Sequence, residues 1–298
     1  MKETAVQFGG APPLVGIVTD PASPPRRASP AVLLLNAGLL HRIGPCRAHV
    51  RLARRLAASG FTVLRLDFSG IGDSEARRNG LGREEATLRE GREAINFLAT
   101  TRGAESFVVM GLCWGAANAF RLTRDDARVA GAVLIDGYAY RTSRYHARHL
   151  RRRMLSWHKW RNLMTGRSES GRQLMRLLGR EIDDPVGPPG GVSYVRSFPP
   201  KQAVLSDLRA MLERGVRLFL LYSEFGMEEY YNYPEQFFDI FPSLSAHPQL
   251  RAELFRGADH TFTLRRHQEE LIGLIEGWMT TAFGEPAGAL RAEPRPSV

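Results

Sequence analysis

The chain has little cysteine: only Cys46 and Cys113 occur in 298 residues. Two thiols cannot form a disulfide framework, and the sequence has no Cys/His spacing typical of a metal site. We therefore expect a protein that depends on neither disulfides nor a metal ion. The sequence indicates no other cofactor.

Long hydrophobic runs are also missing. No apolar run approaches the roughly 18–20 residues that a membrane-spanning helix needs. Residues 1–10 lack the basic region followed by an apolar one that marks a signal peptide. With 43% hydrophobic and 24% charged residues, the composition is that of a globular protein. We expect a cytoplasmic location and no membrane span.

Acidic residues are scarce in one segment. Residues 141–180 contain eleven arginines and Lys159 against a single acid, Glu169. The whole chain has a formal charge of +10, so the rest of it is close to neutral. Three interpretations stay open: a solvated helical face, a surface for an acidic partner such as an acyl carrier protein or a CoA phosphate, and a nucleic-acid or anionic membrane surface. No recognised nucleic-acid module supports the last.

Short apolar runs alternate with segments of helical periodicity along most of the chain. The alternation predicts a mainly parallel sheet between two helical layers, a three-layer α/β fold. The expected strands are residues 12–19, 31–35, 61–67, 107–110, 129–135, 216–222 and 250–255. The expected helices are residues 47–59, 84–101, 116–122, 234–241 and 264–283.

One long stretch breaks this alternation. Residues 138–205 contain no convincing strand and include the arginine-rich segment. We expect this stretch to form an inserted helical cap, with helices near 142–164 and 169–179. The core domain is then residues 1–137 and 206–283. Residues 284–298, with three prolines, are expected to be a disordered tail.

The most informative motif is Gly111-Leu-Cys113-Trp-Gly115. An apolar strand precedes it and a helix-forming run follows, which is the context of a nucleophile elbow with cysteine in place of serine. The glycines are needed because a side chain at either position would collide with the backbone of this tight turn. The alternative interpretation is that Cys113 is a small buried apolar residue, as free cysteines often are.

Three further motifs complete a pattern across residues 12–283. They are Asn36-Ala37-Gly38 after an early strand, Asp67-x-x-Gly70-x-Gly72-x-Ser74, and Ala258-Asp259-His260-Thr261-Phe262 after the last strand. With the elbow, they make the chain resemble the α/β-hydrolases. This resemblance implies a three-layer α/β-hydrolase fold with a mainly parallel sheet and an inserted, arginine-rich helical cap.

Two closer resemblances concern the elbow and the loop that follows the strand at 31–35. The Leu-Asn-Ala-Gly-Leu-Leu-His run and the Gly-Leu-Cys-x-Gly-Ala elbow are similar to small bacterial hydrolases associated with exosortase-type exopolysaccharide systems. A cysteine at the elbow is also similar to dienelactone hydrolases and polyhydroxyalkanoate synthases. None of these resemblances implies a particular substrate for this chain.

The fold implies a role for each motif. Cys113 is the expected nucleophile, and His260 is the expected base because it follows the last strand. The backbone N–H groups of Trp114 and Leu39 are expected to form the oxyanion hole. Gly38 and His41 are expected to line the pocket.

The acid of the triad is the weakest part of the pattern. The fold commonly places it a few residues after the penultimate strand, where this chain has Gly226. The nearest carboxylates are Glu224 and Glu228, and we favour Glu228 because Glu224 lies too close to the strand end to turn toward the histidine. Asp136, after the preceding strand, is a third option.

The resemblance and these residues predict an enzyme that forms a Cys113 acyl-enzyme. Its substrate would be an ester, thioester or lactone, either free or carried by an acyl carrier protein or CoA, and it would act as an esterase, thioesterase or acyltransferase. The missing aspartate motivates an alternative: a non-catalytic hydrolase-fold protein that binds an acidic partner through the basic cap.

Overall fold

The computed structural model describes residues 1–23, 29–78, 80–155 and 198–284. Helix α4 (Ser143–Leu155) agrees with the beginning of the helix expected near 142–164. The rest of that helix, the helix expected at 169–179 and nearly all of the expected tail lie outside the described residues.

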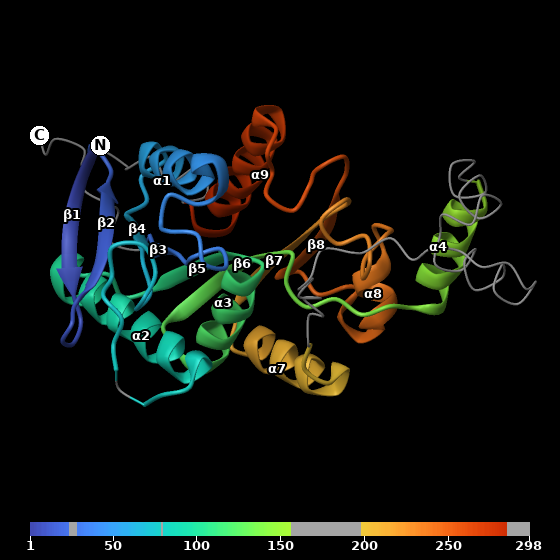
Figure 1. Cartoon of the computed structure of the whole chain (residues 1–298), viewed down its shortest axis with the longest axis horizontal. Helices are drawn as coiled ribbons and strands as arrows, with labels where there is room; N and C mark the ends of the chain where they lie inside the picture. The colour runs from blue at the N-terminus through green and yellow to red at the C-terminus, as the bar shows by residue number, and fades with distance from the viewer. Residues whose placement is uncertain (24–28, 79, 156–197, 285–298) are drawn as a thin grey trace, which may run out of the picture.

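The described chain is organised around an eight-stranded sheet (Figure 1). The six strands β4, β3, β5, β6, β7 and β8, in spatial order, run parallel to one another. Strands β2 and β1 extend the sheet beyond β4 as antiparallel strands at one edge. In spatial order the strands are β1 (Lys2–Phe8), β2 (Leu14–Asp20), β4 (Val63–Leu66), β3 (Ala31–Leu34), β5 (Phe107–Leu112), β6 (Val129–Ile135), β7 (Arg217–Ser223) and β8 (Leu250–Phe255). The parallel sheet confirms the predicted fold class.

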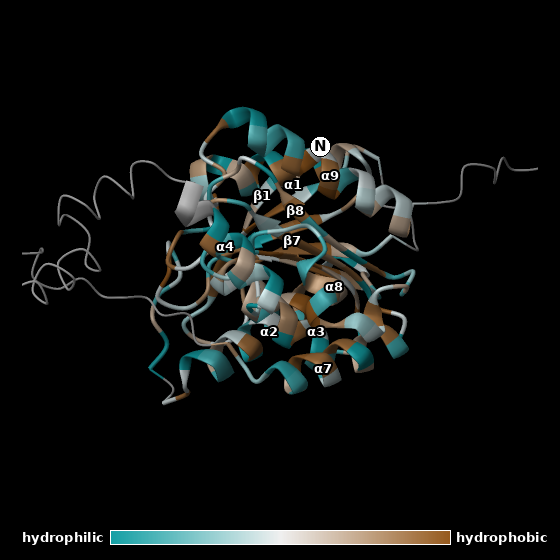
Figure 2. Cartoon of the chain, turned by 90° about the vertical axis from the view of Figure 1, so that its right-hand side faces the viewer, coloured by the Kyte–Doolittle hydropathy of each residue, from teal (hydrophilic) through white to brown (hydrophobic). Residues whose placement is uncertain are grey.

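Helices cover both faces of this sheet (Figure 1). One face carries α1 (Ala48–Ala58) and α9 (Arg265–Phe283). The other carries α2 (Arg83–Arg102), α3 (Trp114–Asp125) and α7 (Lys201–Glu213). Central strands are buried on both sides, which explains why β3 and β5 consist of apolar residues without alternation. Figure 2 shows the resulting brown interior between helices with teal outer sides.

Short helices complete the described chain. Two 3₁₀ turns, Pro45–Arg47 and Pro242–Leu244, flank helical segments, and α8 (Gln236–Ile240) follows β7. None of the helices in the described ranges combines the length and apolar character needed to cross a membrane.

Two elements were not predicted from the sequence. Strand β1 alternates exposed and half-buried residues at the edge of the sheet, so it has no apolar run to mark it. Helix α7 contains the boundary expected at residue 205. Because Val204 and Leu208 are buried in the main core, the core begins before that boundary.

Candidate active site

The turn between β5 and α3 holds Cys113 in a conformation that few residues adopt. Cys113 has φ 59° and ψ −114°, and its thiol-bearing side chain is half-buried. A Cβ at Gly111 would overlap the backbone of Gly115, and a Cβ at Gly115 would lie 2.5 Å from the carbonyl oxygen of Asn36. The two glycines therefore allow strand, helix and neighbouring loop to meet at Cys113, as a nucleophile elbow requires.

His260 lies between Cys113 and a buried carboxylate. Its Nδ1 is 2.6 Å from Oδ2 of Asp136, and its side chain also forms a hydrogen bond with Cys113. Since Nδ1 is engaged by the carboxylate, Nε2 is the nitrogen left for the thiol. The structure thus brings Cys113, His260 and Asp136 together in the order of a nucleophile, a base and an orienting acid.

Asp136 is held rigidly at the end of β6. Its side chain is fully buried, and its backbone has φ 52°. The carboxylate accepts hydrogen bonds from the backbone N–H and the hydroxyl of Ser223, each at 2.6 Å, besides the bond from His260. Three donors satisfy a buried carboxylate that would otherwise be costly. Ser223, on β7, therefore fixes the direction in which Asp136 faces His260.

The charges on both sides of His260 alter its protonation. Burial lowers the pKa of His260, but the hydrogen bonds to Asp136 and Cys113, together with their negative charge, outweigh burial and raise the pKa to about 9. Near neutral pH, the imidazole of His260 is therefore positively charged beside Asp136 and Cys113. A charged imidazole beside a cysteine is the environment that stabilises a thiolate.

This geometry corrects the expectation that Glu228 or Glu224 would be the carboxylate on His260. Glu228 is exposed, and its carbonyl oxygen accepts a hydrogen bond from the Tyr145 hydroxyl at 3.0 Å. Glu224 instead accepts a hydrogen bond from the backbone N–H of Gly257 at 3.0 Å. Both lie on the loop after β7, whereas the carboxylate on His260 comes from the neighbouring strand, β6.

Close packing around Gly226 explains why the usual position of the acid carries no carboxylate. A Cβ at Gly226 would overlap the Ser223 hydroxyl and would lie 2.5 Å from Cα of His260. The loop after β7 therefore packs directly on the backbone of His260. Any side chain at this position would displace either the histidine or the serine that holds Asp136.

We expect Gly226→Ala to lower acylation of Cys113 at least about tenfold and to lower the thermal midpoint, because the new methyl group shifts His260 or Ser223. Gly273→Ala is the matched control. A Cβ at Gly273 meets nothing within 4 Å, and the residue is exposed on α9, so this change is expected to stabilise the helix by about 0.5–1 kcal/mol without altering the rate. Equal rates for the Gly226→Ala protein and the wild type would contradict this account.

A second buried carboxylate, Asp67, orders the loops beside the elbow. Its Oδ1 accepts hydrogen bonds from the Asn36 side chain at 3.0 Å and from the backbone N–H of Arg42 at 2.6 Å. Its Oδ2 pairs with the Arg42 guanidinium, which also binds Asp73 at 2.6 Å. Asp67 therefore joins the loop at 36–44 to the glycine-rich loop at 68–74. Asp73 lies at the exposed side of this cluster, in agreement with a structural role.

The two expected oxyanion donors, Trp114 and Leu39, come from the elbow and from the loop after β3. Trp114 is the first residue of α3, and helix geometry leaves its N–H without a partner within the helix. Leu39 lies on the loop whose first residue, Asn36, approaches Gly115. Its side chain is 71% exposed, and its backbone N–H is the group expected to act as the oxyanion donor. The loop is thus positioned beside the elbow, and donation by Leu39 remains a proposal.

The expected pocket residues differ in their surroundings. The Trp114 ring packs edge-on against Phe68, with a centroid distance of 5.9 Å, and lies beneath the Arg83 guanidinium. Gly38 has φ 60° and open space at its Cβ position, so it leaves room beside the loop. His41 accepts a hydrogen bond at Nδ1 from the N–H of Ile43, within its own loop. This contact ties the His41 ring to its own loop and favours a role in holding that loop in place.

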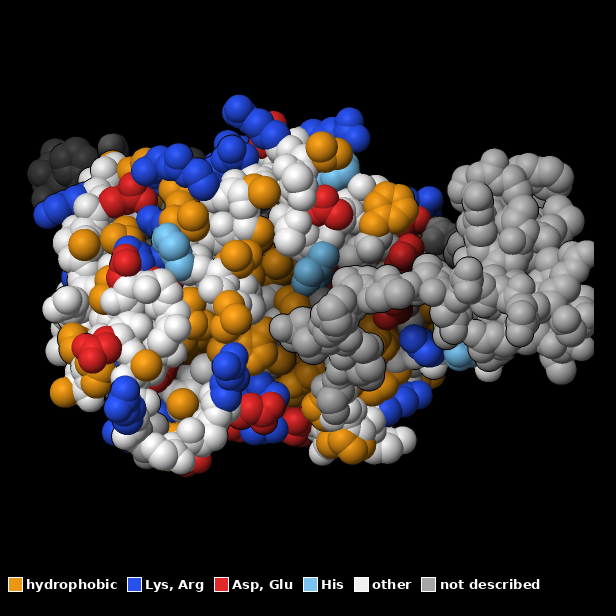
Figure 3. Space-filling model, in the orientation of Figure 1, with side chains coloured by type: hydrophobic (Ala, Val, Ile, Leu, Met, Phe, Trp, Pro, Cys, Tyr) orange, Lys and Arg blue, Asp and Glu red, His pale blue; other side chains and the backbone are white. Residues whose placement is uncertain are grey.

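Exposed apolar side chains lie on loops that follow the strands of the site. These loops follow parallel strands, so their apolar side chains lie toward the same edge of the sheet as Cys113. On the face drawn in Figure 3, an orange area lies beside histidines. The exposed residues on these loops are Leu39, Leu40, Ile43, Phe225 and Leu264.

Sequence reasoning missed Ser223 and ranked Asp136 too low. A signal for Asp136 was present, because it directly follows the apolar strand at 129–135 and so lies at the same sheet edge as Cys113. Ser223 likewise ends β7. Adjacent parallel strands bring such terminal polar residues together, and this rule alone could have paired them.

Comparison with known proteins identifies similar chains and similar folds. Residues 31–177, just under half of the chain, match a family model described as serine aminopeptidase S33. No curated protein sequence matches the chain.

Solved structures of similar architecture cover almost the whole chain. An esterase from Pyrococcus furiosus has 16% identity over 95% of this chain and 91% of its own, with a TM-score of 0.56. An α/β serine hydrolase without lid from Xanthomonas campestris has 14% identity over 99% and 98%, with a TM-score of 0.54. An α/β-hydrolase from Penicillium has 14% identity over 95% and 99%, with a TM-score of 0.59. The chain therefore has the α/β-hydrolase fold.

Proposed function

We propose that the protein is a hydrolase that cleaves an ester, thioester or lactone through an acyl-enzyme on Cys113. The observation that carries the proposal is the connected set of Cys113, His260 and Asp136 at a nucleophile elbow. The match to a hydrolase family over residues 31–177 supports the same reaction class.

In the proposed first half-reaction, the positively charged His260 stabilises Cys113 as a thiolate. The Cys113 thiolate attacks the substrate carbonyl carbon, and a C–S bond forms while the carbonyl oxygen becomes negative. The N–H groups of Trp114 and Leu39 stabilise that oxygen, each contributing on the order of 3 kcal/mol. His260 then donates its Nε2 proton to the leaving alcohol or thiol as the acyl bond breaks.

The second half-reaction returns the enzyme to its starting state. Neutral His260 accepts a proton from water, and the hydroxide attacks the thioester carbonyl. The C–S bond breaks, which regenerates the thiolate beside an imidazolium and releases the carboxylic acid. Asp136 keeps Nδ1 protonated in both steps, so Nε2 is always the nitrogen that exchanges protons.

The surroundings favour a substrate with an apolar part. The exposed apolar side chains on loops after β3 and β7, with Trp114 against Phe68, offer hydrophobic contacts near the carbonyl. Carriers such as CoA or an acyl carrier protein, and transfer of the acyl group to an alcohol or amine, are variants of the same chemistry. The alternative of a non-catalytic binder rested on a missing acid, and Asp136 removes that reason.

The proposal is tested by trapping the acyl-enzyme. The protein is incubated with a panel of aryl esters and acyl thioesters of increasing chain length, and the mass of intact and digested protein is measured at early times. We expect an acyl mass on the peptide that contains Cys113, strongest for the longer chains, with none in Cys113→Ala. An added alcohol or amine separates transfer from hydrolysis by its product.

Absence of the adduct together with unchanged ester turnover in Cys113→Ala would refute the proposal. Cys46 provides an internal control, because it is exposed and lies outside the elbow. Equal labelling of Cys46 would show chemical acylation of thiols rather than catalysis.

A further inference from the structure

Strand β8 ends the described sheet, and its outer side faces no further strand. The hydrogen bonds from Leu218 to Gln249 and from Glu224 to Phe255 show which backbone groups face β7. Backbone groups alternate along a strand, so the odd-numbered residues of β8 bond inward. The N–H and C=O groups of Ala252 and Leu254 and the C=O of Leu250 therefore point outward from the sheet edge, whereas the Leu250 N–H donates to the carbonyl oxygen of His247 at 3.1 Å.

The side chains on this edge carry one charge of each sign, two residues apart. Arg251 and Glu253 lie on the α9 face of β8 and bind one another at 2.6 Å. Their side chains remain 41% and 36% exposed. The Arg251 guanidinium lies over the ring of Phe219, 4.7 Å from its centroid, which holds the charge near the edge.

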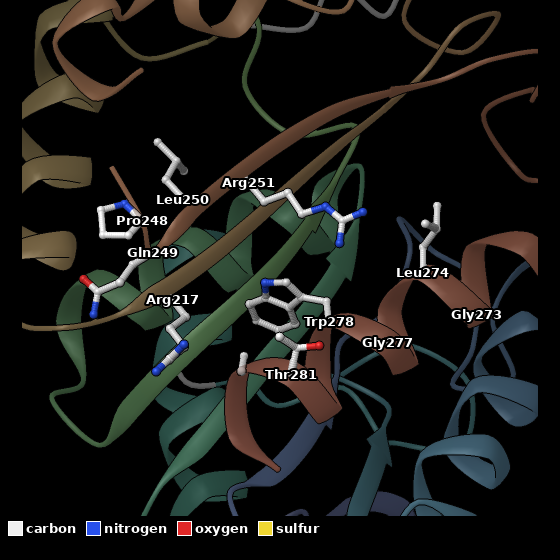
Figure 4. Close-up of a pocket in the computed structure, with 11 residues that line it drawn as sticks. Arg217, Pro248, Gln249, Leu250, Arg251, Gly273, Leu274, Gly277, Trp278 and Thr281 are labelled. Carbon is white, nitrogen blue, oxygen red and sulfur yellow. The ribbon is translucent and has the colours of Figure 1, made fainter. Parts of the chain in front are cut away.

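A groove of about 460 Å³ runs between this edge and α9 (Figure 4). Trp278 lies beneath it, and Gly273, Gly277 and Thr281 line its α9 side. A Cβ at either glycine would meet nothing within 4 Å. Because these two α9 positions carry no side chain, the helix surface beside β8 is recessed, which leaves space for another element to approach the edge.

We propose that β8 pairs antiparallel with β8 of a second copy of this chain, with the two-fold axis at Ala252. Both outward backbone groups of Ala252 then bond to Ala252 of the partner subunit, and the C=O of Leu250 accepts a hydrogen bond from the N–H of the partner's Leu254. In this register Arg251 lies opposite the partner's Glu253, and Glu253 lies opposite the partner's Arg251. The edge is therefore complementary to itself in both hydrogen bonds and charge, as an isologous interface requires.

The charges select this register over its neighbours. Shifting the axis to residue 253 would place Glu253 against itself, and shifting it to residue 251 would place Arg251 against itself. Like charges directly opposite one another destabilise paired strands. An axis at 252 avoids both contacts and forms two opposite-charge pairs. The groove beside α9 then lies at the interface, where the partner's α9 and β8 side chains can occupy it.

A charge exchange tests the pairing and its register together. We expect full-length protein to sediment as a dimer, and Arg251→Glu or Glu253→Arg alone to raise the dimer dissociation constant by about tenfold, because two attractive pairs become repulsive. The double variant Arg251→Glu with Glu253→Arg restores opposite charges in every pair. We expect its dissociation constant to return to within about threefold of the wild-type value.

Two further variants control for folding. Ala252→Pro removes an outward N–H without removing a bond to β7, so the monomer is expected to fold while the dimer is lost. Arg54→Glu reverses a comparably exposed charge, which pairs with Glu3 at the other edge of the sheet, and should leave the dimer unchanged. Thermal unfolding and circular dichroism confirm folding in each case.

A protein that remains monomeric throughout the concentration series would overturn the proposal. So would a dimer that neither single reversal weakens, or a double variant that stays as weak as the single ones. The test measures assembly alone, so its result is independent of the chemistry proposed for Cys113.

Discussion

Replacing Asp136 with asparagine is expected to slow acylation of Cys113 by about 10²–10⁴-fold while the protein stays folded. The asparagine carbonyl can take the place of Oδ1 and still accept the hydrogen bond from the Ser223 N–H. Its amide then faces His260 and donates to Nδ1, which moves the imidazole proton to Nε2. In that tautomer Nε2 has no lone pair to accept the thiol proton. The upper end of the range applies to a serine nucleophile, and a thiol lowers the demand on the acid.

Glu224→Gln and Glu228→Gln are the matched controls for Asp136→Asn. Each removes a carboxylate from the loop after β7, and neither removes the bond to His260. We expect their acylation rates to stay within about twofold of wild type, as for a surface carboxylate. If Glu228→Gln lowered the acylation rate as much as Asp136→Asn does, the assignment of the triad acid to Asp136 on β6 would be wrong.

Asp136→Asn should also change how the stability of the folded protein depends on pH. The folded pKa of His260, about 9, lies above its ordinary value of 6.5. Protonation of His260 therefore stabilises the folded state fully below about pH 6.5, and this contribution is lost as the pH rises through about 9. We expect the thermal midpoint of wild type to fall over that window, measured against His260→Gln. Asp136→Asn removes one cause of the raised pKa and should flatten the dependence.

The second large effect is expected for Cys113→Ala, which should lower turnover of the best ester or thioester by at least about 10⁴-fold. Alanine removes the only group at the elbow that can form the acyl bond. The backbone at φ 59° is no more strained with alanine than with cysteine, since both carry a Cβ, so the turn should persist. Steady-state turnover and the unfolding midpoint, measured on the same preparation, separate loss of chemistry from loss of structure.

Cys113→Ser separates the thiol from the position. A hydroxyl at the elbow retains the geometry but does not ionise beside an imidazolium, so His260 loses one of the partners that raise its pKa. We expect slower acylation than wild type but a measurable serine adduct, because Asp136 and His260 still form a complete base. A Cys113→Ser protein as inactive as Cys113→Ala would show that catalysis here requires the thiolate pair.

Much of the fold could be predicted because burial leaves a clear pattern. The apolar runs at 129–135 and 250–255 became β6 and β8 with the expected ends. Strand β1 could not be predicted in this way, because an edge strand with polar residues is stabilised by pairing with β2 rather than by an apolar sequence. Helix α7 was not predicted because its first residues, 201–205, were assigned to the expected cap.

The site was predictable where one local motif determines it. The elbow glycines and Cys113 act within five residues, so their spacing alone indicates the turn. The acid depends on packing between β6, β7 and the loop after β8, three segments far apart in sequence. The loop after β7 has no room for a side chain at position 226, and only the fold reveals this.

The placement of the acid on β6 has a mechanical consequence for the segment in which a cap is expected. The Tyr145 hydroxyl binds the carbonyl oxygens of Glu228 and Glu229, which fastens the first turns of α4 to the loop after β7. An acid on that loop would be displaced whenever α4 shifted. Asp136 is anchored within the sheet instead, so changes in the length or sequence of the cap are expected to leave the alignment of the imidazole unaltered.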